Sequence, residues 1–151
     1  LPMNISEAIA KEDIYTERCF DISWLRKHGL KSSFKNRKLT SGPIKSAILN
    51  AITPTKATWN GHNASAWKDD ILSVNGFDER MQYGGEDREL GERLMNKGIK
   101  GKQIRYTAVT LHLDHPRGYV KEEMILKNRT IRDETKASKS VWTDFGIVKN
   151  T

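Results

Sequence analysis

A pair of adjacent glycines, Gly84-Gly85, constrains the fold of this chain strongly, because an apolar helical pattern begins directly after it. Over residues 86–97, Leu90 and Leu94 fall on one face of a helix, and Gly98 supplies the residue type that ends helices. Glycine adopts backbone conformations that other residues rarely adopt, and it lets a ligand approach the backbone closely. The pattern therefore predicts a glycine turn that leads into a helix with an acidic start.

Glu86 and Asp87 are the first candidates for chemistry. Acidic residues in a first helical turn commonly do no more than complement the helix dipole, which is worth about 0.3–1 kcal/mol each. The glycines before them favour a second interpretation, in which the helix N-terminus holds two carboxylates towards a substrate, with the ring of Tyr83 as a surface for a sugar. Glu89 and Arg93 lie four residues apart on this helix and are expected to form a pair exposed to solvent.

Periodicity and turn residues predict further elements: helices over 44–52, 66–74 and 120–136, and strands over 57–66 and 103–113. Ser65 is the expected N-cap of the second of these helices, and Asn75-Gly76 is its expected end. Beyond residue 137, Trp142 and Phe145 are the side chains expected to dock the tail.

The net charge of +7 and the isoelectric point near 9.5 indicate acidic partners such as phosphorylated small molecules or an anionic membrane. The excess is densest in a basic stretch that contains no acidic residue: Lys31, Lys35, Arg37, Lys38 and Lys45. Phe34 is its only aromatic residue, so a nucleic-acid platform is not expected. The single cysteine excludes an internal disulfide and a four-thiolate zinc site, and the cytoplasm is the expected compartment.

His112 and His115 lie at the end of the second expected strand, three residues apart. Both imidazoles can reach one ion if the strand bends there, and a borderline metal such as manganese or zinc suits imidazole with carboxylate ligands. An isolated pair with this spacing is more often structural. In the turn at 60–63, Asn60, His62 and Asn63 either satisfy backbone groups or bind a polar ligand.

These pieces follow one another in a recognisable order: the glycine turn at 61–65, the segments 67–72 and 74–79, the acidic run at 83–87, and the two histidines. In this order they resemble the C-terminal half of family 2 and galactosyltransferase-like glycosyltransferases, over residues 58–119. The resemblance implies an α/β fold class, namely the C-terminal part of a GT-A-type mixed-sheet fold. This is the nucleotide-diphospho-sugar transferase fold, here without its N-terminal nucleotide-binding strands.

The resemblance also implies roles for particular residues. Asp87 corresponds to the catalytic base that takes a proton from the acceptor hydroxyl, and Glu86 binds the acceptor or positions the base. His115 corresponds to a late metal ligand, with His112 as a second ligand for Mn²⁺ or Mg²⁺. The substrate-binding residues implied are Tyr83, Gly84, Gly85, Gly61, Asn63 and Arg88. A single-displacement, inverting transfer from a nucleotide-sugar donor to a glycan or glycolipid acceptor follows from this chemistry.

The Asp-x-Asp motif of these enzymes occurs nowhere in the chain. We therefore expect either part of a longer enzyme or a degenerate relative, and in both cases little turnover by this chain alone. The expected organisation is a helical, basic connecting segment over 1–56 with a mobile loop at 32–43, the acceptor and catalytic-base region over 57–136, and a C-terminal tail over 137–151. Peripheral contact with the inner face of an anionic membrane is also expected.

Two other functions are compatible with the residues. A non-catalytic basic module would hold an anionic polymer through its loops. A metal-dependent hydrolase would use His112, Asp114 and His115, although this cluster lacks a partner of the kind that catalytic zinc sites have.

Overall fold

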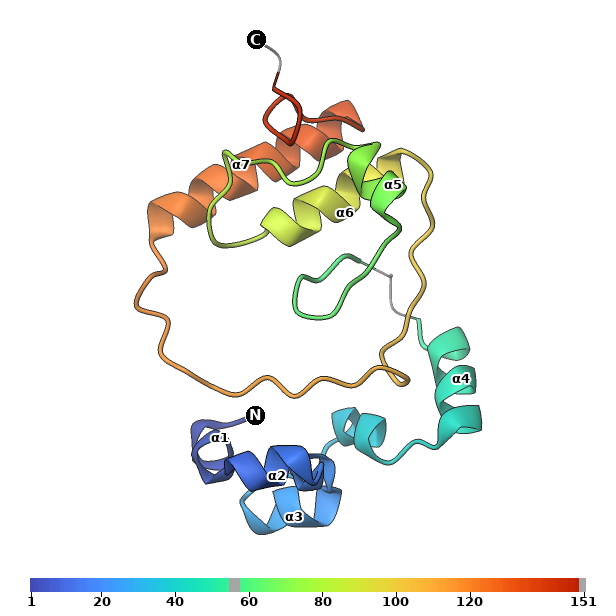
Figure 1. Ribbon diagram of the computed structural model, residues 1–151, viewed down its shortest axis with the longest axis vertical. Helices are drawn as coiled ribbons and strands as arrows, with labels where there is room; N and C mark the ends of the chain where they lie inside the picture. The colour runs from blue at the N-terminus through green and yellow to red at the C-terminus, as the bar shows by residue number, and fades with distance from the viewer. Residues whose placement is uncertain (55–57, 150–151) are drawn as a thin grey trace. The chain divides into compact units, whose positions relative to one another are not determined.

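The computed structural model describes residues 1–54 and 58–149, which form two compact units. The first comprises residues 1–54 and 103–117, and the second comprises residues 58–102 and 118–149. The helices of the first unit are α1 (Met3–Ala8), α2 (Lys11–Tyr15), α3 (Ile22–Lys27) and α4 (Pro43–Ile52), with 3-10 helices η1 (Arg18–Phe20) and η2 (Phe34–Leu39). The second unit contains α5 (Lys68–Leu72), α6 (Glu86–Asn96) and α7 (Glu122–Ser138), as Figure 1 shows.

The expected mixed sheet is not present in the described residues, so the α/β GT-A fold class predicted from the sequence is wrong for them. Their only β-type pairing is an isolated bridge between Phe145 and Lys149. Residues 103–113 alternate in polarity but are interrupted by a turn, in which Ile104 O accepts hydrogen bonds from Thr107 N and Ala108 N at 3.0 and 2.9 Å. Alternation produces a strand only where a second strand satisfies its backbone groups, and the described chain offers none.

The first unit is built from short helices around Ile5, Cys19 and Leu25, which are buried. Burial raises the pKa of the Cys19 thiol. Residues 103–117 join this unit through Asn50 of α4, whose side-chain oxygen accepts the Tyr106 N–H at 2.9 Å. The basic stretch contains a turn of 3-10 helix, η2, where the sequence predicted a loop. No helix in the described residues is long and apolar enough to cross a membrane.

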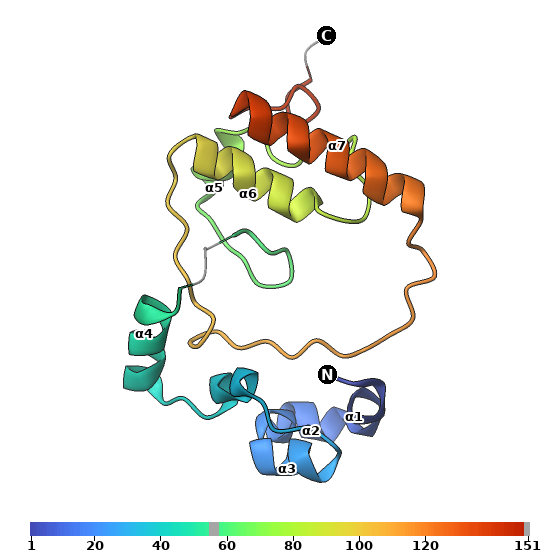
Figure 2. The same ribbon diagram turned by 180° about the vertical axis from the view of Figure 1, so that it is seen from behind.

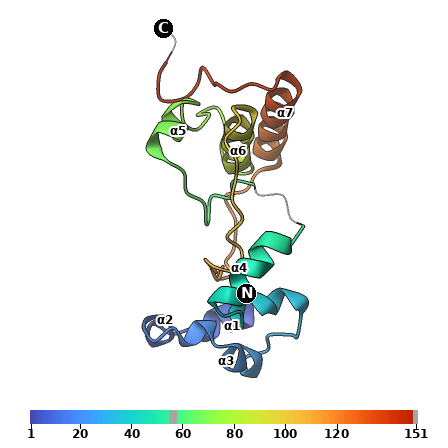
Figure 3. The same cartoon turned by 90° about the vertical axis from the view of Figure 1, so that its right-hand side faces the viewer.

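Helices α6 and α7 pack against each other and form the frame of the second unit (Figure 2). Seen from the side, α6 lies between α5 and α7 (Figure 3). The apolar centre consists of Val74, Leu90 and Leu94. The predicted helix at 86–97 is confirmed, including its end, where Gly98 has a φ of 92° and the Ile99 N–H bonds back to Leu94 O. The predicted helices at 44–52 and 120–136 are confirmed with small shifts of their ends.

The Glu89–Arg93 pair is buried, so the prediction of an exposed pair is wrong. Both side chains are 1% exposed, and their ion pair is 2.8 Å long. Arg93 also donates to the carbonyl oxygens of Val74 and Gly76, and Thr135 of α7 donates to Glu89 at 2.9 Å. These hydrogen bonds tie α6 to two other segments, and they offset the cost of burying the two charges.

Helix α5 is shorter than the helix predicted at 66–74. It begins after Trp67 rather than Ser65, and it ends at Leu72, before the Asn75-Gly76 pair that was expected to end it. Both residues of the pair have positive φ, 65° and 71°. The buried Asn75 side chain donates to Thr143 O and Val148 O and accepts from Val148 N, at 2.7 to 2.9 Å. The tail therefore docks through its backbone, whereas Trp142 and Phe145, which were expected to dock it, are 40% and 44% exposed.

A buried carboxylate, Asp78, lies beside this tail and makes the stability of the folded state fall at acid pH. Burial by itself would raise the pKa of Asp78, but hydrogen bonds from Arg80 and Thr143 outweigh it and hold that pKa below its ordinary value. The folded state therefore binds the proton less tightly than the unfolded state does. The resulting stability is present above the unfolded pKa and is lost as the pH falls towards the folded pKa.

We expect Asp78→Asn to lower the free energy of unfolding at pH 7 and to flatten its decline between about pH 5 and pH 2. Urea unfolding at several pH values measures both effects. The matched control is Asp69→Asn, at an exposed position of α5, which should retain the wild-type decline. Equal acid sensitivity of the wild type and the Asp78 variant would contradict the prediction.

Candidate active site

The Gly-Gly-Glu-Asp run forms a turn that enters α6, as the sequence predicted. Gly84 and Gly85 have φ values of 110° and 95°, which other residues rarely adopt. A Cβ atom at Gly84 would lie 2.3 Å from the end of the Ile125 side chain of α7, so a larger residue here would have to displace that side chain as well as adopt the positive φ. The Glu86 carboxylate accepts the Gly84 N–H at 2.7 Å and so fixes the turn. One oxygen of Glu86 is thus occupied in holding the turn.

Asp87 lies against the glycine turn at residues 60–63. Its Oδ2 atom accepts the Gly61 N–H at 2.8 Å, and its Oδ1 atom accepts the Arg88 N–H at 2.7 Å. The structure therefore brings Gly61 and Asp87 together, although they lie 26 residues apart in the sequence. Each carboxylate oxygen can accept a further hydrogen bond, so Asp87 is oriented and still able to receive a proton.

Asn128 of α7 holds the backbone in front of the two acids. It is fully buried, and its side-chain nitrogen donates to Gln82 O at 3.0 Å and to Gly84 O at 3.1 Å. Its side-chain oxygen accepts the Gln82 N–H at 3.3 Å. The sequence places Asn128 only on a helix; the signal that could have found it is a polar residue among the inward positions of an amphipathic helix.

We expect Asn128→Ala to destabilise the protein by about 1–3 kcal/mol, because it removes three hydrogen bonds that the buried Asn128 side chain makes with the backbone of Gln82 and Gly84. Hydrogen exchange at the Gly84 amide should become faster, since the turn loses its anchor. Thermal unfolding and exchange measured by NMR test the two effects. As a control, Asn96→Ala removes a mostly exposed amide from α6 and should leave exchange at Gly84 unchanged; a similar response of both variants would argue against a specific anchor.

Tyr83 and Tyr119 contact each other edge to face, with ring centroids 5.1 Å apart and an interplanar angle of 83°. Tyr83 is half-buried beside the glycine turn, so part of its ring is accessible. Asn63 closes the turn at 60–63 through its N–H, which donates to Asn60 O at 2.9 Å. The predicted strand over 57–66 is replaced by this turn within its described part, 58–66.

His112 and His115 contact each other, with ring centroids 5.5 Å apart. The Nδ1 atom of His115 lies 3.1 Å from the Pro116 carbonyl oxygen, to which it can donate. The Nε2 atom of His112 instead faces the Arg117 guanidinium at 3.4 Å, where it accepts. A metal ion would have to displace that cation from His112.

The described residues contain no group of three histidine, cysteine or acidic side chains that could hold a metal ion. The roles of His112 and His115 as metal ligands stay predictions. The two histidines belong to the first unit, and the acidic run belongs to the second, so each is described within its own unit.

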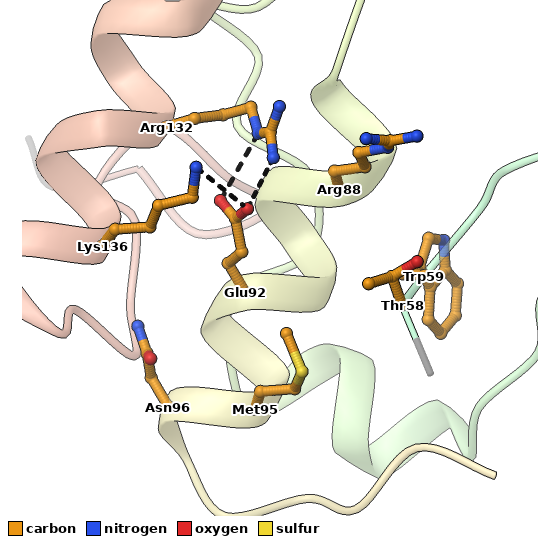
Figure 4. Close-up of a pocket in the computed structure, with 8 residues that line it drawn as sticks. All are labelled: Thr58, Trp59, Arg88, Glu92, Met95, Asn96, Arg132 and Lys136. Atoms are coloured by element: carbon orange, nitrogen blue, oxygen red, sulfur yellow. Dashed lines mark hydrogen bonds and ion pairs between the residues drawn. The ribbon is translucent and has the colours of Figure 1, made fainter. Parts of the chain in front are cut away.

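A pocket of about 280 Å³ lies on α6 in the second unit (Figure 4). Arg88, a predicted substrate-binding residue, lines it together with Glu92 and Met95 of α6, Trp59, and Arg132 and Lys136 of α7. Glu92 forms ion pairs with Arg132 at 2.6 Å and with Lys136 at 3.6 Å. The sequence patterns did not indicate Trp59, Arg132 or Lys136 as binding residues, because the packing of α7 on α6 is what brings them together.

Residues 54–116 match a family model described as the N-terminal domain of galactosyltransferase. This match covers less than half of the chain, and it includes the turn at 60–63, the acidic run and both histidines. This stretch is similar to galactosyltransferases, which confirms the resemblance seen in the sequence. Membership of family 2, and the assignment to a C-terminal half, stay predictions. Comparisons with curated proteins and with solved structures found no match.

Proposed function

We propose that this chain is the acceptor-side, catalytic-base part of a glycosyltransferase that moves a sugar from a nucleotide-sugar donor to a glycan or glycolipid. The observation that carries the proposal is the placement of Asp87 at the start of α6, where the Gly61 N–H orients its carboxylate. The galactosyltransferase-like match over the same residues supports it.

In the proposed reaction, Asp87 accepts the proton of an acceptor hydroxyl group, whose oxygen attacks the anomeric carbon of the donor sugar. The bond from that carbon to the donor diphosphate breaks, and the nucleoside diphosphate leaves with the electron pair. A single displacement inverts the anomeric centre. Glu86 acts mainly by holding the glycine turn, because its Oε2 atom accepts the Gly84 N–H.

A divalent ion, Mn²⁺ or Mg²⁺, belongs to the proposal only as a cofactor of the complete enzyme. His115 is the better candidate ligand of the two histidines, because its ring contacts a carbonyl oxygen, whereas the Nε2 atom of His112 faces the Arg117 guanidinium group. Such an ion would offset the negative charge of the departing diphosphate. Its remaining ligands are not provided by a cluster among the described residues.

We also propose a cytoplasmic location with contact to an anionic membrane surface. Ile44, Ile48 and Ile52 lie four residues apart on α4 and are 79%, 54% and 66% exposed. The basic stretch lies next to them in the sequence. An apolar stripe beside cationic side chains is typical of elements that lie at a membrane interface.

The direct test of the function is acceptor-dependent release of nucleoside diphosphate by the full-length protein from a panel of nucleotide sugars. A glycosyltransferase releases diphosphate faster when an acceptor glycan is present, and the product gains the mass of one sugar. A full-length protein that produces neither change with any donor and acceptor pair in the panel would refute the proposal.

A further inference from the structure

The pocket on α6 carries more positive than negative charge. Three cations, Arg88, Arg132 and Lys136, line it against one carboxylate, Glu92. Glu92 is 13% exposed and pairs with Arg132 and Lys136, so it fixes the two α7 cations in position rather than removing their charge. An anionic group in this pocket would meet cations that are already oriented, which lowers the cost of binding.

Arg88 is the cation with unused capacity. Among the residues that the structure describes, no carboxylate forms an ion pair with its guanidinium group. Arginine can bind a carboxylate or a phosphate through two parallel hydrogen bonds. In Figure 4 its side chain extends from the first turn of α6, and its guanidinium group points away from Arg132 in this view. This unpaired guanidinium points to an anionic ligand.

The other lining residues indicate the rest of the ligand. Trp59 and Met95 supply an aromatic and an apolar surface. The volume of about 280 Å³ is slightly below the usual range for ligand pockets, so a single sugar unit suits it better than a whole nucleotide sugar. An amphipathic ring with one charged substituent matches an aromatic wall combined with cations.

The pocket shares its elements with the candidate active site. Arg88 follows Asp87 directly on α6, and Trp59 lies two residues before Gly61, which donates to the Asp87 carboxylate. Trp59 is held tightly against this helix, since a Cβ atom at Gly91 would lie 2.4 Å from the Trp59 Cβ atom. A glycan held in the pocket would therefore be anchored on the helix that carries the proposed base.

We propose that this pocket binds an acidic sugar of the acceptor glycan, a hexose that bears a carboxylate or a phosphate group. This inference rests on the proposed transferase function and adds a substrate class to it. Arg88 and Lys136 bind the anionic group, and Trp59 contacts the ring. The acidic sugar then places a neighbouring hydroxyl group of the acceptor near Asp87.

The test is equilibrium binding to the full-length protein, measured by NMR with glucose, glucuronate, glucose 6-phosphate, inorganic phosphate and uridine diphosphate. We expect at least one acidic hexose to bind about tenfold more tightly than glucose, as a hydrogen bond to a charged group predicts. Arg88→Gln and Lys136→Gln should each abolish most of this preference. Arg129→Gln removes an exposed cation of α7 outside the pocket and should leave it unchanged.

Three outcomes would overturn the inference. Equal binding of glucose and of both acidic hexoses would mean that the charged substituent contributes nothing to recognition. Inorganic phosphate that binds as tightly as glucose 6-phosphate would show a bare anion site without sugar recognition. Displacement of the acidic hexose by uridine diphosphate would assign the pocket to the donor.

Because binding is measured without turnover, the two proposals can fail separately. Acidic-sugar binding without transfer in the assay above would support the assignment of the pocket and refute the transferase function. Transfer to neutral acceptors without acidic-sugar binding would support the transferase function and refute the assignment of the pocket.

Discussion

In the full-length protein, Asp87→Asn lowers the rate of sugar transfer by about 100- to 10,000-fold, the usual contribution of a general base. Asparagine has nearly the same shape, and its side-chain oxygen can still accept the Gly61 N–H that Asp87 accepts at 2.8 Å. The substitution therefore removes the proton acceptor with little disturbance of the turn. Substrate binding should change much less than the rate constant, because the lost interaction forms mainly in the transition state.

Glu86→Gln is the matched control for this variant, since it replaces the neighbouring carboxylate by an amide. The amide oxygen can keep the hydrogen bond from the Gly84 N–H, so the turn should persist and the loss of rate should be smaller. Steady-state kinetics with the wild type and both variants separates the two roles. Turnover of Asp87→Asn close to that of the wild type would remove the base assignment.

Glu89→Ala should be the most destabilising single substitution tested, at about 3–5 kcal/mol, because it leaves Arg93 buried without its counter-charge. Arg93 is fully buried, and its other partners are the carbonyl oxygens of Val74 and Gly76. Carbonyl groups alone do not compensate a buried guanidinium charge. The junction between α5 and the tail is expected to loosen first, since Arg93 is bonded to it.

Asp133→Ala provides the comparison, because Arg129 and Asp133 form a pair with the same spacing on the exposed face of α7. Removing an exposed partner should cost less than about 1 kcal/mol. Urea unfolding of the two variants measures the difference. Similar costs would mean that the Glu89–Arg93 pair is solvated in solution, as the sequence alone suggested.

The helices were predictable because their signals are local. The start of α6 depends on two glycines and two acids, and its end depends on Gly98, so neighbouring residues determine both boundaries. Ser65 failed as a cap because several alternative starts lie within a few residues, and local preference does not choose among them.

The sheet was not predictable in this way, because a strand depends on a partner elsewhere in the chain. Residues 103–113 alternate as a strand does, yet they turn at 104–108 and attach to α4 through Asn50. The resemblance to GT-A enzymes suggested a sheet that these described residues do not form. Alternating polarity reports which side chains face inward and not what pairs with the backbone.

By itself, the sequence determined the glycine turn, the acidic start of α6 and the similarity to galactosyltransferases, because all three depend on residue types at short spacing. Only the tertiary structure decided that Glu89 and Arg93 are buried, that Asn128 anchors the turn, and that Arg88 shares a pocket with α7. These features join residues that lie on separate helices or loops, and burial follows from packing between such elements. A pattern within one element does not contain that information.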